Sequence, residues 1–202
     1  MYSNISGLVI GFHGCDRETG EAVLRGKRHL KSSTNDYDWL GHGVYFWENA
    51  PQRARDFACW KRTQKGRKGG AMDPFVVGAV LDLGNCLNLQ DTQHHPLLRR
   101  VYEFLEKKAL GFGIEMPENT LGGDKLLRRR DCAVIQAFHA YASENNAASF
   151  DTVRSAFEEG EPVYPGAGFR DKTHIQICVR NPSCIKGYFR PIDENGVAVD
   201  FG

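Results

Sequence analysis

The order of strand-like and helix-like segments constrains the fold of this chain more than any other feature. Short β-prone segments lie near both ends, whereas the segments with helical spacing of apolar residues gather between them. No regular series of alternating strands and helices is present, so a doubly wound parallel sheet is not expected. The sequence therefore predicts an α+β fold.

The spacing of apolar residues also predicts the individual elements. Alternating or Val-rich runs are typical of strands, and apolar residues three and four positions apart are typical of helices. Pro51 suits the first turn of a helix, and Gly26 suits the residue that closes one. The expected strands are 7–13, 44–47, 75–83, 174–179 and 185–189. The expected helices are 18–26, 51–64, 96–110, 124–143 and 150–159, with loops at 31–38 and 160–171 and a mobile basic loop at 61–70.

Length and charge limit the function classes. The 202 residues are expected to form a single domain spanning 1–202. With 26 Lys and Arg against 25 Asp and Glu, the net charge of +1 provides no global field to hold duplex DNA or an anionic bilayer. The first residues lack a basic region, and the apolar run Leu8–Phe12 is too short for a signal sequence or a membrane span. We therefore expect a cytoplasmic protein without membrane contact.

The cysteines point to reduced thiols. Six Cys are spread along the chain, none of them in a CxxC pair, and the single short spacing joins Cys178 to Cys184. This density is far below that of a disulfide scaffold, and no second pair completes a zinc-finger pattern. No structural metal is expected.

Three short segments carry polar or aromatic groups beyond what packing requires. His13 and Gly14 end a buried strand. In the segment 39–48, Tyr45 and Trp47 share one strand face, so one face is predicted to be core and the other free to stack on a flat ligand. In the segment 173–180, alternate residues form an apolar face, and the opposite face carries His174, Gln176 and Cys178. A solvated polar face is the alternative interpretation of that last pattern.

Taken together, these segments resemble the diphtheria-toxin-like, PARP-type ADP-ribosyltransferases, whose signature is a His, a Tyr and usually a Glu on three strands. Phe12-His13-Gly14 resembles the first motif, and Gly41 to Phe46 resembles the Gly-x-Gly-Ile/Val-Tyr-Phe motif, followed by a helix from Pro51. The third strand is then 174–179. The resemblance covers residue 7 to about residue 190, and it implies two small, packed, mostly antiparallel sheets that form an NAD cleft flanked by helices.

The resemblance also implies roles for single residues. His13 would hydrogen-bond the ribose hydroxyls of NAD, and the backbone of Gly14 would bind the nicotinamide amide. Tyr45 would stack on the nicotinamide ring, and Gly43, the second glycine of its motif, would also lie at the cofactor. The catalytic set would be His13, Tyr45 and Gln176, with NAD as the co-substrate.

This chain departs from the family at Gln176, where the usual residue is Glu. The family's carboxylate stabilises the positive charge that grows on the ribose as nicotinamide leaves. A Gln retains an acceptor oxygen without the charge, which is compatible with single transfer and disfavours chain elongation. An inactivating substitution would leave the same residue.

Several residues outside these motifs are candidates for contact with the acceptor of ADP-ribose. Glu161 and Asp171, in the loop before the third strand, are candidates for deprotonating an acceptor. Surface solubility is the alternative role for these and for Glu48 and Glu159. Exposed Trp39 and Trp47 are candidates for stacking on bases. Basic groups expected to flank the cleft, or else to be solvated or to bind the NAD pyrophosphate, are Arg53, Arg55, Arg128–Arg130, Arg170 and the stretch Lys61–Lys68.

These features lead to a functional expectation with alternatives. The leading hypothesis is a mono-ADP-ribosyltransferase that modifies RNA or single-stranded nucleic acid, similar to bacterial toxins and phage-defence effectors and restrained by a neutralising antitoxin protein. The alternatives are a protein mono-ADP-ribosyltransferase, an NAD glycohydrolase and a non-catalytic binder of NAD or ADP-ribose.

Overall fold

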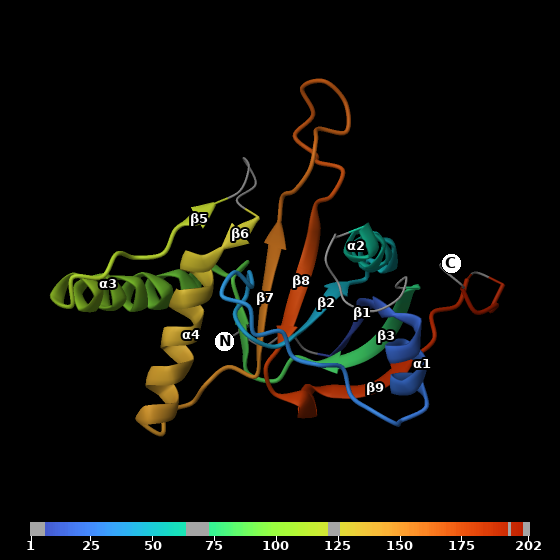
Figure 1. Cartoon of the computed structure of the whole chain (residues 1–202), viewed down its shortest axis with the longest axis horizontal. Helices are drawn as coiled ribbons and strands as arrows, with labels where there is room; N and C mark the ends of the chain where they lie inside the picture. The colour runs from blue at the N-terminus through green and yellow to red at the C-terminus, as the bar shows by residue number, and fades with distance from the viewer. Residues whose placement is uncertain (1–6, 64–72, 121–125, 194, 200–202) are drawn as a thin grey trace.

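A computed structural model describes residues 7–63, 73–120, 126–193 and 195–199. The described chain combines one large sheet with four α-helices and is of the α+β class, as expected (Figure 1). The predicted mobile loop at 61–70 lies outside the described residues from position 64 onward. The α-helices are α1 (Arg17–Leu24), α2 (Pro51–Thr63), α3 (His95–Gly111) and α4 (Arg129–Glu144), and short 3₁₀ turns are formed by Thr92–His94 and Pro182–Cys184.

Seven strands form the main sheet, in the spatial order β4-β7-β8-β2-β1-β3-β9. Neighbouring strands are antiparallel except for β4 and β7, which are parallel. The main strands are β1 (Leu8–Asp16), β2 (Val44–Glu48), β3 (Pro74–Asp82), β4 (Cys86–Asn88), β7 (Thr152–Phe157), β8 (His174–Val179) and β9 (Ile185–Phe189). A separate two-stranded ladder joins β5 (Asn119–Thr120) and β6 (Leu127–Arg128).

The prediction of two separate packed sheets is corrected to one sheet made of two halves. The halves meet at a seam where β1 pairs with β2 through only two residue pairs, Gly11 with Glu48 and Phe12 with Trp47. In Figure 1 the strands β7 and β8 stand upright, whereas β3 and β9 run sideways at the lower right. A Cβ on Gly11 would lie 2.8 Å from atoms of both Leu81 and Phe46, one from each half. Because Gly11 has no side chain, the two halves of the sheet can pack closely together at the seam and share one core.

Each face of the sheet is covered. On one face, here the α1 face, side chains of both halves pack with Val23 of α1 around Phe46, Val77 and Ile177. On the opposite face, here the α2–α4 face, Trp47 packs with α2 through Ala54. At the other end of that face, α4 contributes Ile135, which packs in the cluster of Leu40, Leu87, Ile135, Val153, Phe157 and Cys178. Among the described helices, none is long and apolar enough to cross a membrane.

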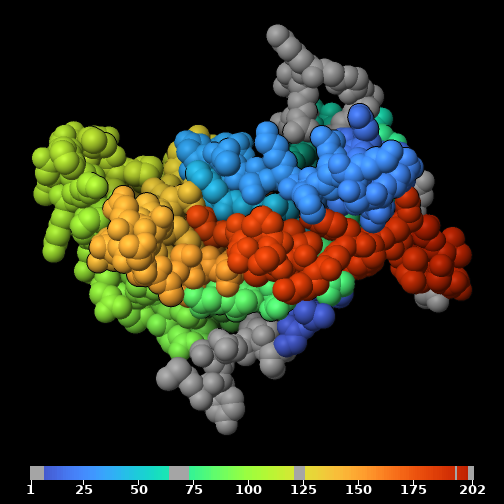
Figure 2. Space-filling view, turned by 90° about the horizontal axis from the view of Figure 1, so that it is seen from below, coloured from blue at the N-terminus to red at the C-terminus, as the bar shows by residue number. Residues whose placement is uncertain are grey.

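The segment that follows α1 covers the α1 face beside β9. In Figure 2, which shows the molecule from below, the red C-terminal region lies beside the blue residues that follow α1. Leu30 from that segment is buried in the core of the α1 face, against which Tyr188 of β9 packs. The segment thus closes the open edge of the core.

Most predicted elements are confirmed, with one clear error and one helix that begins later than predicted: the helix expected from residue 124 starts at Arg129, because Leu127–Arg128 forms β6. β8 and β9 have the predicted bounds, and α2 begins at Pro51 as expected. The predicted helix 150–159 is wrong, because Thr152–Phe157 forms strand β7. Thr152 and Val153 are fully buried there, where the strand pairs with both β8 and β4. Burial between two strand partners overrides the weak local helical pattern.

Candidate functional site

His13 lies at the seam between the two halves of the sheet. Its Nδ1 is 2.7 Å from the backbone oxygen of Tyr45. Because a carbonyl oxygen only accepts hydrogen bonds, Nδ1 carries the proton and Nε2 is the acceptor. Burial lowers the pKa of His13 to about 4, which outweighs the opposing effect of the Tyr45 hydrogen bond, so the ring is neutral near pH 7.

Strand alternation separates the predicted catalytic side chains. Tyr45 faces Cys178 in the register of β2 and β8, and Trp47 faces Gln176, so Tyr45 and Gln176 share the α2–α4 face. His13 lies on the other face, where its ring meets the edge of Phe46 at 5.9 Å between centroids. The structure brings His13 to the backbone of Tyr45 and not to its ring.

The Tyr45 ring is held by packing and by its hydroxyl group. The hydroxyl donates to the carbonyl of Gly41 at 2.7 Å and accepts from the backbone N–H of Leu40 at 2.8 Å. Burial raises the pKa of Tyr45 well above its usual value, so the phenol stays protonated. The tyrosine therefore fixes the turn that precedes its own strand.

The two glycines predicted to contact a cofactor also permit close packing. A Cβ on Gly14 would lie 2.1 Å from the backbone oxygen of Ala54 in α2. A Cβ on Gly43 would lie 2.5 Å from the Sγ of Cys178. Both positions therefore have a packing reason to be glycine.

Gln176 lies in the middle of the α2–α4 face, between Trp47 on β2 and Ser155 on β7. It is partly exposed, and its amide forms no side-chain hydrogen bond with the described residues. An amide in this state offers one acceptor oxygen and two donor hydrogens to a ligand.

A polar cluster beside Gln176 was not predicted as a unit. It consists of Trp47, Arg53, Glu159 and His174. Arg53 donates to Glu159 at 3.1 Å, and His174 Nδ1 lies 3.8 Å from the same carboxylate oxygen. Buried polar atoms in this cluster lack a hydrogen-bond partner among the described residues, namely Trp47 Nε1, Arg53 Nε and His174 Nε2. Unsatisfied buried groups are rare, so this concentration marks a place where a ligand or water is expected.

His174 is held neutral within the cluster. Its Nδ1 donates to the carbonyl of Lys172 at 2.6 Å, which leaves Nε2 as an acceptor. Burial, followed by the charges of Arg53 and Arg128, lowers the pKa of His174 to about 4. The sequence signal for this cluster was the position of His174 at the start of β8, directly after the loop that carries Glu159.

Of the two acids predicted to act on an acceptor, Asp171 is bound within its own loop through its carboxylate, whereas Glu161 takes part through its backbone. Asp171 accepts from the backbone N–H of Glu161 at 2.9 Å, and its own N–H donates to the carbonyl of Glu161 at 3.0 Å. Both side chains are exposed at the base of the loop that rises above β7 and β8 in Figure 1. Glu159 is the acid of this segment that lies at the α2–α4 face.

The predicted exposure of the aromatic residues is partly wrong. Trp47 is 4% exposed and packs on Phe57 with 4.9 Å between centroids, so the prediction of a free face for ligand stacking on β2 fails for this residue. Trp39 is half-buried, and the guanidinium of Arg128 lies 4.4 Å from its ring centroid. Glu48 is bound on the α1 face by Arg154, at 2.5 and 2.8 Å.

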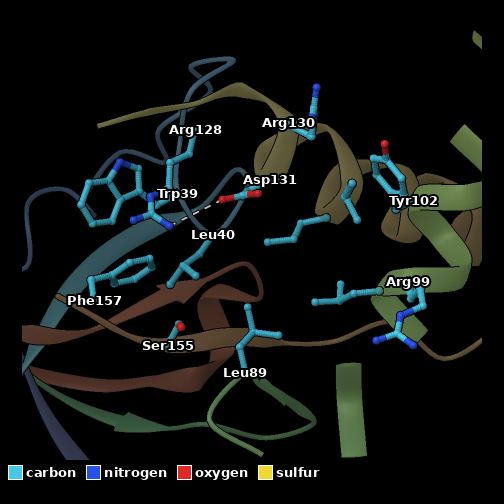
Figure 3. A pocket seen from close by; sticks show the side chains of 13 residues that line it. Trp39, Leu40, Leu89, Arg99, Tyr102, Arg128, Arg130, Asp131, Ser155 and Phe157 are labelled. Atoms are coloured by element: carbon cyan, nitrogen blue, oxygen red, sulfur yellow. Dashed lines mark ion pairs between the residues drawn. The ribbon is translucent and has the colours of Figure 1, made fainter. Parts of the chain in front are cut away.

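A pocket of about 450 Å³ opens at the α4 end of the same face (Figure 3). In this view Trp39, Arg128 and Phe157 gather on one side, and Tyr102 and Arg99 of α3 lie on the other. Ser155, the cross-strand neighbour of Gln176, belongs to the lining. The pocket therefore begins next to Gln176.

The cysteines are all free, and four of them, Cys15, Cys132, Cys178 and Cys184, are buried. Burial raises the pKa of Cys178 to about 12, so this thiol is protonated near pH 7. Among the described residues, no group of three or more His, Cys, Asp or Glu side chains is placed to hold a metal ion.

Comparison with known proteins adds one distant relative. The uncharacterized protein MJ0359 of Methanocaldococcus jannaschii is 25% identical over 193 residues, which cover 87% of this chain and 83% of that protein. No family model matches the sequence. No solved structure matches it either. The name of the archaeal relative assigns no activity.

Proposed function

We propose that this protein is an ADP-ribosyltransferase that cleaves NAD and transfers one ADP-ribose to a macromolecular acceptor, with RNA or single-stranded nucleic acid as the expected acceptor. The proposal includes an ADP-ribosyltransferase-like arrangement, in which NAD lies at the seam between the two halves of the sheet. The short pairing of β1 with β2 and the bend between the halves are consistent with this arrangement.

The observation that carries the proposal is the state of His13. The hydrogen bond to Tyr45 fixes the proton on Nδ1, and the pKa of about 4 keeps the ring neutral. The Nε2 atom has no partner among the described residues, so it can accept a hydrogen bond from a ribose hydroxyl. A neutral acceptor fixed by its neighbour suits recognition of a sugar.

Gln176 would act on the nicotinamide ribose. Its amide oxygen can accept a hydrogen bond from the 2″-hydroxyl group. When the C1″–N bond breaks, its electron pair leaves with nicotinamide, a lone pair of the acceptor forms the new bond to C1″, and the acceptor's proton passes to water. Without a negative charge, Gln176 stabilises the cationic ribose less than a carboxylate would.

Incubation with NAD tests the proposal. The full chain is incubated with NAD labelled in its adenosine and with cell extract, and both free nicotinamide and labelled macromolecules are measured. We expect both products, with His13→Ala reducing them by about 10²-fold, a typical effect of removing a positioned polar group, and His29→Ala, in an exposed loop, serving as the matched control. Absence of both products would overturn the proposal.

A non-catalytic NAD or ADP-ribose binder is the second candidate. The neutral Gln176 and the separation of His13 from Tyr45 and Gln176 across the sheet favour it. It predicts measurable NAD binding with NAD intact after hours. Free ADP-ribose without labelled macromolecule would instead indicate an NAD glycohydrolase, and a label removed by protease would indicate a protein acceptor.

The cellular setting follows from the chemistry proposed. An activity that consumes NAD in the cytoplasm harms its own host, which suits a toxin or phage-defence effector. A neutralising antitoxin protein is therefore part of the proposal. Co-purification of a tightly bound partner from the native host tests this part.

A further inference from the structure

The lining of the pocket beside Gln176 carries more cationic than anionic side chains. It carries three guanidinium groups, from Arg99, Arg128 and Arg130, and one carboxylate, from Asp131. Asp131 is already engaged by Arg128, at 3.6 Å, and by the side chain of Asn119, at 2.8 Å. Arg130 donates to the carbonyl of Pro117 at 2.8 Å and lies 3.9 Å from Glu118, so Arg99 adds the positive charge of the lining that these acids do not offset. The pocket therefore favours an anionic ligand, and guanidinium groups match phosphate oxygens in geometry.

The walls of the pocket combine aromatic rings that are held in place with the exposed guanidinium group of Arg99. Trp39 is held by a hydrogen bond from its Nε1 to the carbonyl of Leu126 at 2.8 Å and by contact with Phe157 at 4.5 Å. On the opposite wall, Tyr102 lies one helical turn after Arg99 on α3. Arg99 is exposed and forms no hydrogen bond or ion pair with the described residues. This combination of rings and guanidinium groups is typical of surfaces that bind bases and phosphates.

The pocket also lies where an acceptor must lie. Ser155 in its lining is directly opposite Gln176 in the antiparallel register, which places their Cα atoms about 4.5–5.5 Å apart. If Gln176 contacts the nicotinamide ribose, a group in the pocket is next to that sugar. A volume of about 450 Å³ is sufficient for one nucleotide, and falls within the usual range for ligand pockets.

We propose that this pocket binds one nucleotide of a single-stranded nucleic acid and presents it as the acceptor of ADP-ribose, an inference that rests on the function proposed above. The pocket is a recess between α3, α4 and the sheet, so a base that reaches its floor has left its stack, which favours an unpaired nucleotide. The positive charge of Arg99 disfavours a Lys or Arg side chain of a protein acceptor. An attacking atom of the nucleotide supplies the lone pair for the bond to C1″, nicotinamide leaves with the electrons of the broken C–N bond, and the proton of the attacking group goes to water.

A pair of neighbouring arginines provides the test. Arg99 lines the pocket, whereas Arg100, also exposed on α3, does not. Binding of a short fluorescein-labelled single-stranded RNA to the full chain is measured by fluorescence anisotropy over a range of salt concentrations, with the Arg99→Ala and Arg100→Ala variants alongside. We expect Arg99→Ala to weaken binding about tenfold and to lower the salt slope by about 0.7, the value for one phosphate contact on a single strand. Arg100→Ala is expected to leave both unchanged.

Other outcomes separate this inference from the function on which it rests. Equal losses in the two variants, or no loss in either, overturn the pocket as the binding site. A transferred label that is removed by protease and resists nuclease overturns the nucleic-acid acceptor. Release of nicotinamide without dependence on Arg99 for RNA labelling overturns only this inference. RNA binding that depends on Arg99 without any nicotinamide release overturns the proposed function and the acceptor role together.

Discussion

The two ends of the α2–α4 face differ in how closely they are packed. At the α2 end, the helix backbone lies against Gly14 so closely that even a methyl group has no room, and Trp47, Ala54 and Val76 are buried. At the α4 end, α3 has no buried residue along its length, and a pocket of about 450 Å³ remains between the helices and the sheet.

This difference indicates where the molecule can accept a ligand without rearrangement. The packed α2 end holds the strands of the seam and the backbone near His13 in place. The open α4 end offers volume, charge and aromatic surface. Gln176 and His174 lie between the two ends, with the unsatisfied polar atoms of the cluster beside them. In the proposed transferase, the packed α2 end would position the sugar and the open α4 end would admit the acceptor.

The largest expected effect is at the packed end. Gly14→Ala places a Cβ 2.1 Å from the backbone oxygen of Ala54, and a helix backbone cannot yield as a flexible side chain does. We expect a loss of at least about 3 kcal/mol in the free energy of unfolding, measured by urea denaturation. Gly187→Ala on β9, where nothing lies within 4 Å of the added atom, is the matched control and should change stability by less than about 0.5 kcal/mol. Equal effects of the two variants would contradict the close packing at α2.

The second prediction concerns the boundary between the two ends. The pKa of His174 is lowered to about 4 in the folded protein, mainly by burial. Between about pH 4 and pH 6.5 the unfolded chain therefore binds more protons, and the free energy of unfolding falls as the pH falls. Above pH 6.5 neither state is protonated at this site, so no change is expected. The slope from one such imidazole approaches about 1.4 kcal/mol per pH unit.

His174→Gln should reduce this slope, because the variant has one buried imidazole fewer to protonate. His13, whose pKa is also lowered to about 4, should account for part of the slope that remains. Urea denaturation at several pH values between 4 and 7 measures both proteins. Because the readout is the slope, a uniform loss of stability in the variant does not obscure it. Parallel curves for the two proteins would show that His174 is not held neutral by the fold.

These predictions rest on residues that the sequence revealed to different degrees. β8 was predicted with correct bounds because Ile175, Ile177 and Val179 alternate with polar residues, a local pattern that does not depend on the partner strands. β7 was mistaken for a helix because its burial comes from pairing with β8 and with β4, the latter more than sixty positions earlier in the chain. β8 also lies between two strands, β2 and β7, so the difference is in the local pattern: its side chains alternate along the strand, whereas those of β7 do not show its pairing with β4 and β8.

The candidate site shows the same limit. His13, Tyr45 and Gln176 were predicted from motifs, but their distribution over two faces follows from the register of β1, β2 and β8. The cluster around Glu159 draws Arg53 from α2 and His174 from β8, so its members are far apart in the sequence. The pocket needs Arg99 and Tyr102, which a helical pattern alone assigns to an ordinary amphipathic surface.

The third prediction tests whether Gln176 faces the reacting sugar. Gln176→Glu adds a negative charge between the packed and open ends, where the proposed reaction develops positive charge on the ribose. We expect nicotinamide release to rise about tenfold or more. The neighbouring change Ser155→Ala, on the acceptor side, should leave release in the absence of acceptor unchanged. An unaltered rate with Gln176→Glu would place NAD away from this face and favour the non-catalytic binder.

The smallest expected effect lies at the far end of the open region. Leu110 near the end of α3 is 80% exposed, and no residue of that helix is buried. Leu110→Gln therefore removes little buried apolar area, and we expect the free energy of unfolding to change by less than about 0.5 kcal/mol. Ile135→Ala on α4 is the contrast, because this residue is 2% exposed in the core cluster and should cost about 2–5 kcal/mol. If the two variants were equally destabilised, α3 would be packed in solution against something that covers Leu110, and the α4 end would be less open than the isolated chain indicates.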